Sequence, residues 1–276
     1  MSTLKPMRLI RRLPFSGKLG LTVVALWIVV ALFGPLVAPY PIGAFVDQNV
    51  FSGVSSRFLL GSDYLGRDVL SRLLSAGRYT VGLGAAAALL ACTVGTSLAL
   101  MAAVGKRWLD EALSRFMDTV ISIPSKILAL VMVAAFGSSL GLLLLIAGLT
   151  YVPGNYRIAR SLAVNINQMD YVTVARARGE GPMYIAFREI LPNMIHPLLA
   201  DFGLRFVFIV LLLSALSFLG LGVQPPDADL GSLVRENISG IADGAPAILM
   251  PALAIATLTV GVNLLIDALP KAGGRA

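Results

Sequence analysis

The sequence predicts an all-α integral membrane protein with about six transmembrane helices. Hydrophobic residues make up 57% of its 276 residues, charged residues only 13%, and the mean hydropathy is +0.83. Soluble domains carry about twice that share of charge, so this composition cannot cover a whole surface that faces water. The apolar residues are also gathered in long runs along the chain. We therefore expect lipid to surround much of the protein.

Six apolar runs account for the predicted helices. They cover approximately residues 19–38, 79–104, 116–136, 139–163, 195–219 and 247–266. About 20 apolar residues are enough for a helix to cross the hydrocarbon core of a bilayer. Because the backbone must satisfy its own hydrogen bonds there, each run is interpreted as a helix. Only a few residues near 137–139 separate the third and fourth runs, which predicts an antiparallel hairpin. The Gly and Ala content of 82–104 predicts close helix packing.

The lysine and arginine residues indicate the orientation. With a cytoplasmic N-terminus, fifteen basic residues fall in inner segments and five in outer segments. Basic residues are enriched on the cytoplasmic side of membrane proteins, so both termini are predicted in the cytoplasm. This prediction divides the chain into a tail (1–18), a transmembrane domain (19–268) and a second tail (269–276). Within the domain, 39–78 and 220–246 are long outer segments and 164–194 is the largest inner segment.

Several kinds of chemistry are not expected. The chain has no G-x-x-x-x-G-K-[ST] loop and no H-E-x-x-H motif, so no nucleotide site, catalytic residue or metal site is predicted. The single cysteine, Cys92, lies in an apolar run, and the single histidine, His196, starts another. The net charge is +7, and the lysine and arginine residues lie between the apolar runs without forming a basic stripe. This distribution argues against a nucleic-acid partner.

The most informative inner stretch runs from Asp170 to Pro192. Residues 170–178 can form a short helix, which Gly179 can end in a left-handed conformation. Pro182 can begin a second helix, with Ile185 and its apolar neighbours on one side. Such a helix–Gly–helix segment could fit a groove on a partner protein, or it could be a solvated loop. The residues alone leave both interpretations open.

This stretch resembles the EAA loop of ABC importer permeases, the element that docks onto the ATPase subunit. That loop has the pattern Glu-Ala-Ala-x-x-x-Gly followed by Leu-Pro about a dozen residues later. Thr173 and Val174 replace the Glu and the first Ala of the pattern. The resemblance implies the following ATPase-coupling residues: Thr173, Val174, Ala175, Arg176, Ala177, Arg178, Gly179, Leu191 and Pro192.

Two further motifs are similar to the C-type subunits of the dipeptide/oligopeptide/nickel permeases. They are Leu-Gly-Ser-Asp-Tyr-Leu-Gly-Arg-Asp from residue 60 and Ser-Phe-Leu-Gly-Leu-Gly-Val-Gln-Pro-Pro from residue 217. The resemblance covers about residues 19–268. Its signature residues are Gly61, Asp63, Gly66, Arg67, Asp68, Gly220, Gly222, Pro225 and Pro226.

This resemblance implies a type I ABC importer permease fold in a bacterial or archaeal cytoplasmic (inner) membrane. The chain would form half of a pathway for short peptides or related small molecules and would be no enzyme itself. The implied partners are membrane lipid, a second permease subunit (DppB/OppB-like), two ATP-binding subunits and a periplasmic or extracellular substrate-binding protein. ATP and magnesium would bind the ATP-binding subunits.

Asp201 and Arg205 are charged residues inside the fifth apolar run. A charge at the centre of a bilayer costs about 2.5–3.5 kcal/mol on insertion scales. Their spacing of four places them on one helical face, where they can neutralise each other. Both a structural pair and a role in lining the translocation pathway remain open.

Two other classes of function are alternatives for a chain with this composition. A secondary transporter or channel would need no ATPase, and ATP-dependent uptake distinguishes it from an importer subunit. An intramembrane enzyme would need a catalytic dyad, which the sequence does not offer.

Overall fold

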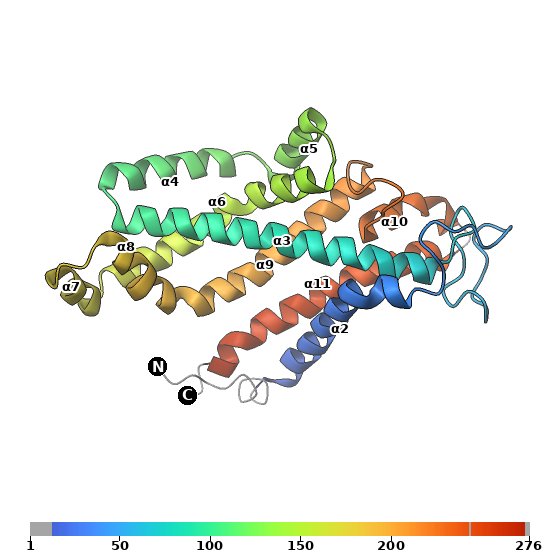
Figure 1. The fold of residues 1–276 in the computed structure, drawn as a ribbon, viewed down its shortest axis with the longest axis horizontal. Helices are drawn as coiled ribbons and strands as arrows, with labels where there is room; N and C mark the ends of the chain where they lie inside the picture. The colour runs from blue at the N-terminus through green and yellow to red at the C-terminus, as the bar shows by residue number, and fades with distance from the viewer. Residues whose placement is uncertain (1–12, 243, 274–276) are drawn as a thin grey trace.

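The computed structural model describes residues 13–242 and 244–273, with side chains to residue 268. The regular elements of these residues are helices, and they contain no β-strand (Figure 1). Of the predicted tails 1–18 and 269–276, residues 1–12 and 274–276 lie outside the described residues, whereas α2 already begins at Phe15 and α11 continues to Gly273. The helices are α2 (Phe15–Val37), α3 (Val69–Val104), α4 (Arg107–Ile121), α5 (Ser125–Phe136), α6 (Leu140–Asn167), α7 (Asp170–Ala177), α8 (Pro182–Tyr184), η1 (Ile185–Ile190), α9 (Leu191–Phe218), α10 (Leu230–Glu236), η2 (Ile238–Ile241) and α11 (Pro246–Gly273).

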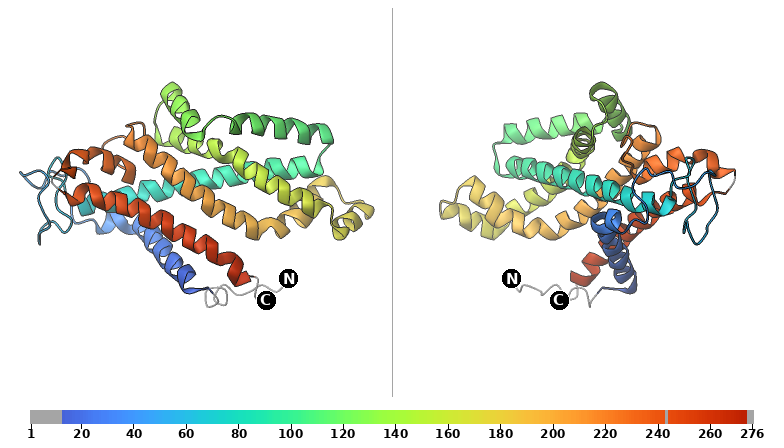
Figure 2. Two further views of the ribbon diagram at one scale, coloured as in Figure 1. Left: turned by 180° about the vertical axis from the view of Figure 1, so that it is seen from behind. Right: turned by 45° about the vertical axis from the view of Figure 1, so that its right-hand side comes forward.

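Within these residues, five helices are long and apolar enough to cross a membrane, or six if a bent pair counts as one span. This number agrees with the prediction of about six spans. The helices α7 and α8 form one end of the molecule, and α10 with residues 38–68 forms the opposite end (Figures 1 and 2). We call these the hairpin end and the α10 end. The termini of the described chain lie away from α10.

The long helix α3 forms the centre of the bundle and packs against α2, α6 and α9 (Figure 2). Its small residues allow this, because Ala87, Ala88 and Ala91 are completely buried. At the contact with α6, a Cβ on Gly148 would lie 2.3 Å from a methyl carbon of Leu90. Small residues at helix contacts let the backbones approach closely, as predicted for 82–104.

The helix α3 begins at Val69, although the sequence predicted a start near residue 79. The first turns carry Arg72 and Arg78, so they do not belong to the apolar run from which the boundary was taken. Asp68 caps the helix and accepts a hydrogen bond from the backbone N–H of Ser71 at 2.8 Å. An Asp at the N-cap satisfies a free N–H of the first turn. The predicted outer segment 39–78 is therefore irregular only up to residue 68.

The predicted third helix, 116–136, is broken. Helices α4 and α5 meet at an angle of 85° across residues 122–124. Pro124 cannot donate a hydrogen bond, and its ring would clash with the carbonyl of Val120 in a continuous helix. The 12 residues of α5 extend over about 18 Å, less than the hydrocarbon core of about 30 Å. The predicted hairpin with the fourth helix is present, with Gly137 at φ +95° and Ser139 capping α6.

Two other boundaries differ from the prediction at the hairpin end. The helix α6 continues to Asn167, four residues beyond the expected end at 163. The fifth span has no break at residue 195, because one continuous helical span runs from Pro182 to Phe218. Much of the predicted inner segment 164–194 therefore extends the membrane helices.

Candidate coupling, pathway and outer sites

Residues 170–190 form a second hairpin, called the hairpin from here on, whose first arm is α7 and whose second arm consists of α8 and η1. Its tip is formed by the end of α7 and Gly179. Gly179 has φ +84°, a conformation that glycine adopts without steric cost. Its N–H donates to the carbonyl of Arg176, and the N–H of Glu180 donates to the carbonyl of Ala175. These two bonds are the Schellman pattern, in which a left-handed residue satisfies the last carbonyls of a helix. The predicted helix stop at Gly179 is confirmed.

The predicted coupling residues divide between an exposed surface and a buried one. On α7 and at its C-cap, the exposed residues are Thr173, Val174, Arg176, Ala177 and Arg178, whereas Ala175 is completely buried. Val172, also buried, belongs with Ile185 and Ile190 to one apolar cluster. The α7 helix therefore rests on the second arm and presents its other face outward. Leu191 and Pro192 lie apart from this surface, at the base of α9.

The second arm passes into α9 through a π-helical turn, η1. The N–H of Leu191 bonds to the carbonyl of Ala186, five residues earlier. Pro192 explains the wider turn, because a proline inside an α-helix clashes with the carbonyl four residues before it. A π-turn moves that carbonyl aside, and such turns often occur at functional sites. The Leu-Pro motif thus shapes the connection between the hairpin and the membrane helix.

A polar contact that the sequence did not reveal joins α7 to α6. The guanidinium of Arg176 donates to the side-chain carbonyl of Asn167 at 2.6 Å, and the amide of Asn167 donates to the backbone carbonyl of Ala103 at 2.8 Å. Asn167 is the last residue of α6, so it connects three segments at the hairpin end. No sequence motif marked it.

Asp201 and Arg205 form a buried ion pair on α9, with Nη2 to Oδ1 at 3.1 Å and Nε to Oδ2 at 3.3 Å. Both residues are less than 10% exposed. Asn155 of α6 donates to the Asp201 carboxylate at 2.7 Å, and Thr96 of α3 donates to Asn155 at 3.2 Å. Three helices therefore contribute to this group, which we call the three-helix network. The sequence predicted the pair but neither Asn155 nor Thr96.

The three-helix network requires glycine on the neighbouring helices. A Cβ on Gly154 of α6 would lie 2.4 Å from Nη1 of Arg205, and a Cβ on Gly95 of α3 would lie 2.4 Å from Oδ1 of Asn155. Any larger residue would occupy the space of these polar groups. The pair is therefore built into the helix contacts. The pair is buried and its carboxylate also accepts a bond from Asn155, which favours the structural interpretation, since breaking a buried pair is strongly destabilising.

At the α10 end, the first signature motif forms a tight turn before α3. Gly61 and Gly66 have φ values of +77° and +73°. A Cβ on Gly66 would also lie 2.2 Å from the carbonyl oxygen of Asp47. Asp63 is 1% exposed and accepts bonds from the N–H groups of Leu65 and Arg67 at 2.8 and 2.9 Å. The turn itself therefore requires glycine at positions 61 and 66 and a hydrogen-bond acceptor at position 63.

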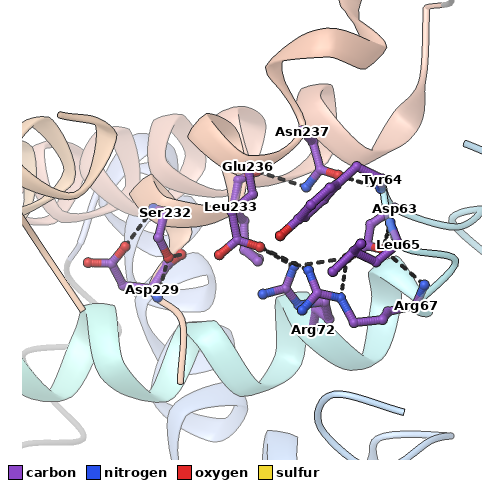
Figure 3. Close-up of polar contacts among 10 residues, drawn as sticks. All are labelled: Asp63, Tyr64, Leu65, Arg67, Arg72, Asp229, Ser232, Leu233, Glu236 and Asn237. Carbon is purple, nitrogen blue, oxygen red and sulfur yellow. Dashed lines mark hydrogen bonds and ion pairs between the residues drawn. The ribbon is translucent and has the colours of Figure 1, made fainter. Parts of the chain in front are cut away.

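The same turn is joined to α10 by ion pairs that we call the outer clamp (Figure 3). Arg72 bridges Asp63 at 2.9 Å and Glu236 at 2.7 Å. Arg67 makes the same two contacts, at 2.7 and 2.9 Å. Asn237 adds a bond from the N–H of Tyr64 at 3.2 Å. Two carboxylates thus balance two guanidinium groups, and sequence analysis missed Glu236 and Asn237.

The second signature motif leads from α9 into α10. Gly220 has φ +86° and lies against the guanidinium of Arg235, while Gly222 packs on Ser217, and the Pro225–Pro226 bond is cis. Asp229 then caps α10 in a reciprocal pair with Ser232 and also accepts a bond from Ser217. Burial raises the pKa of Asp229, and its hydrogen bonds with Ser217 and Ser232 oppose the rise. These contacts hold α10 against α9.

Among residues 13–242 and 244–268, no three His, Cys, Asp or Glu side chains form a group that could hold a metal ion. The polar clusters of this part of the chain are instead ion pairs and helix caps. Their geometry suits holding helices and loops in place.

Comparison with known proteins identifies related chains. Residues 95–272 match the family described as binding-protein-dependent transport system inner membrane component. The dipeptide transport system permease protein DppC of Alkalihalophilus pseudofirmus is 31% identical over 92% of this chain and 83% of its own length. The glutathione transport system permease protein GsiD of Pectobacterium atrosepticum is 31% identical over 90% and 83%. The di/tripeptide transport system permease protein DppC of Pseudomonas aeruginosa is 33% identical over 92% and 86%.

Proposed function

Because the chain belongs to the binding-protein-dependent transport system inner membrane component family, we propose that it carries short peptides or peptide-like molecules across the cytoplasmic membrane. The chain is a transmembrane permease subunit of an ABC importer and no enzyme itself. The relatives support the substrate class, because their names specify dipeptides, di- and tripeptides, and glutathione. Glutathione is itself a tripeptide, so all these cargoes share peptide bonds and a carboxylate.

The observation that carries the proposed mechanism is the continuous helical connection between the second arm of the hairpin and α9. In this proposal the exposed face of α7, around Val174, docks onto an ATP-binding subunit. Because Pro182–Phe218 is one continuous helical span, a displacement of the hairpin moves a helix of the pathway directly. ATP and magnesium would bind the two ATP-binding subunits, and closure of those subunits would drive the change in access.

The remaining partners follow from the same proposal. A second permease subunit (DppB/OppB-like) would complete the pathway, and the α10 end would face the substrate-binding protein. The hairpin end and both termini would then be cytoplasmic, as the distribution of basic residues predicts. We assign Asp201 and Arg205 a structural role within the three-helix network.

Reconstitution tests the proposal. The complex of this chain, its partner permease, the ATP-binding subunits and the binding protein is placed in liposomes with a labelled dipeptide, a tripeptide and glutathione. We expect uptake of at least one of these that requires both ATP and the binding protein. Uptake that proceeds without ATP would instead identify a secondary transporter.

Cysteine labelling tests the orientation in cells. In a Cys92→Ala background, Ser56→Cys on the exposed outer segment should react with an impermeant maleimide from outside. Glu180→Cys at the hairpin should react only after the membrane is opened. Reaction of the Glu180→Cys variant in intact cells would reverse the proposed orientation.

A further inference from the structure

The side chain of Asn193 connects the two arms of the hairpin. Its Nδ2 donates to the backbone carbonyl of Glu189 at 2.7 Å and to the phenol oxygen of Tyr171 at 3.1 Å. Asn193 is the third residue of α9, and Tyr171 is the second residue of α7. One amide therefore joins the start of the first arm to the base of the membrane helix.

The backbone just before Asn193 is irregular. In η1 the N–H of Leu191 bonds five residues back, and Pro192 has no N–H to donate. The carbonyls of the turn therefore have fewer backbone donors than those of a regular helix. The amide of Asn193 supplies a donor to Glu189 and has a second N–H for Tyr171. The same amide thus contacts both the irregular turn and α7.

The α7 helix is held by polar contacts on both sides. On one side Arg176 bonds to Asn167 at the end of α6, and on the other Tyr171 bonds to Asn193 at the start of α9. Between these two contacts, Val172 and Ala175 are the only residues of α7 that are buried. Two buried side chains on a helix of eight residues leave rotation about its axis weakly restrained. The two polar contacts lie at the exposed surface of the hairpin and add to the restraint that the buried side chains give.

We propose that Asn193 is a positioning residue for transport coupling, which ties α7 to α9 so that movement of the hairpin tip reaches the membrane helix. Without it, part of the movement is absorbed by rotation of α7 about its remaining contact with α6. This inference rests on the proposed docking of α7 onto an ATP-binding subunit. The inference adds Asn193, which lies outside the coupling motif, to the residues that transmit movement, and Tyr171 as its contact on α7.

A distance measurement on the purified subunit tests the geometry independently of any ATPase. In a Cys92→Ala background, spin labels are placed at the exposed positions Thr173 and Lys106, and their distance distribution is recorded by pulsed electron paramagnetic resonance. We expect Asn193→Ala to broaden the distribution, and Tyr171→Phe to broaden it to a similar extent. The double variant should be no broader than Asn193→Ala alone, because both changes remove one contact.

Gln168→Ala provides the matched control. Gln168 is an exposed amide in the same segment, and the hydrogen bonds of the described chain involve its backbone only. Its removal should leave the distance distribution unchanged. An unaltered distribution in Asn193→Ala would overturn the proposal.

The assembled transporter tests the function. We expect Asn193→Ala and Tyr171→Phe to lower the amount of dipeptide transported per ATP hydrolysed several-fold, while the ATP-binding subunits still copurify with the permease. A residue needed only for folding would lower the yield of complex and leave this ratio unchanged. A broadened distance distribution with a normal ratio would refute the role of Asn193. Failure of the unmodified chain to retain any ATP-binding subunit would refute the docking proposal instead.

Discussion

The ion pair of the three-helix network allows a quantitative prediction. Asp201 accepts two hydrogen bonds from Arg205, at 3.1 and 3.3 Å, and one from Asn155 at 2.7 Å. Asp201→Asn removes the negative charge and leaves the guanidinium buried without a counter-charge. Removing one partner of a buried ion pair costs about 3–5 kcal/mol. We expect a loss of stability of this size.

Thermal unfolding of the purified complex measures this loss. For a chain of 150–250 residues, each kcal/mol changes the midpoint by about 2–4 °C, so Asp201→Asn should lower it by roughly 6–20 °C. Asp118→Asn is the control, because Asp118 and Arg157 are 4.0 Å apart with side chains 64% and 63% exposed. Exposed pairs contribute about 0–1 kcal/mol. If both variants lower the midpoint equally, the structural account of the pair is refuted.

Removing both charges distinguishes structure from transport. Asp201→Leu with Arg205→Leu leaves no buried charge, but it leaves the amide of Asn155 without its acceptor, at a cost of about 1–3 kcal/mol. Adding Asn155→Leu removes that cost, and the hydroxyl of Thr96, which loses Asn155 as its acceptor, can turn to a carbonyl of its own helix. The triple variant should therefore be more stable than Asp201→Asn and should still transport. A stable triple variant that cannot transport would show that these side chains line the pathway. It would also favour a substrate that carries an acidic group.

Three other predictions concern the hairpin and the outer clamp. Gly179→Val should cost about 1 kcal/mol or more locally and lower substrate-stimulated ATPase activity, whereas Gly181→Val should not, because Gly181 has φ −76° and neither position is crowded. Pro192→Ala should convert the π-turn to α-helix, rotate the hairpin relative to α9 and lower the same activity with the complex intact. Arg72→Met should destabilise the complex by about 1.5–3 kcal/mol and speed hydrogen exchange in α10, whereas Arg78→Met, at an exposed position of α3, should do neither.

The membrane helices and the hairpin could be predicted because their signals are local. Gly179 is followed by a helix-breaking Gly-Pro pair, and the residues before it form a regular helix, so the left-handed stop could be identified from the sequence. The break between α4 and α5 was missed although Pro124 is visible there. In an apolar run of that length, membrane helices often continue through a proline, because neighbouring groups satisfy the freed carbonyl. Which outcome occurs depends on tertiary contacts.

The outer clamp could not be predicted because its partners are distant in the chain. Arg67 and Asp63 are four residues apart and within one motif, but Arg67 and Glu236 are separated by 169 residues. The acidic partner lies on α10, whose position depends on how α9 and α11 pack. A charged motif in the sequence indicates that a counter-charge is needed without specifying which residue supplies it.

The three-helix network has the same limitation, but glycine offers a partial signal. The spacing of Asp201 and Arg205 predicts their pairing, whereas Asn155 is found only once the register of α6 against α9 is known. In the structure, a glycine lies opposite each large polar group: Gly154 faces Arg205, and Gly95 faces Asn155. A buried guanidinium or amide needs the volume that a side chain would otherwise occupy. A glycine next to a polar residue within a membrane helix, as in Gly154-Asn155, is therefore the feature from which this network could have been proposed.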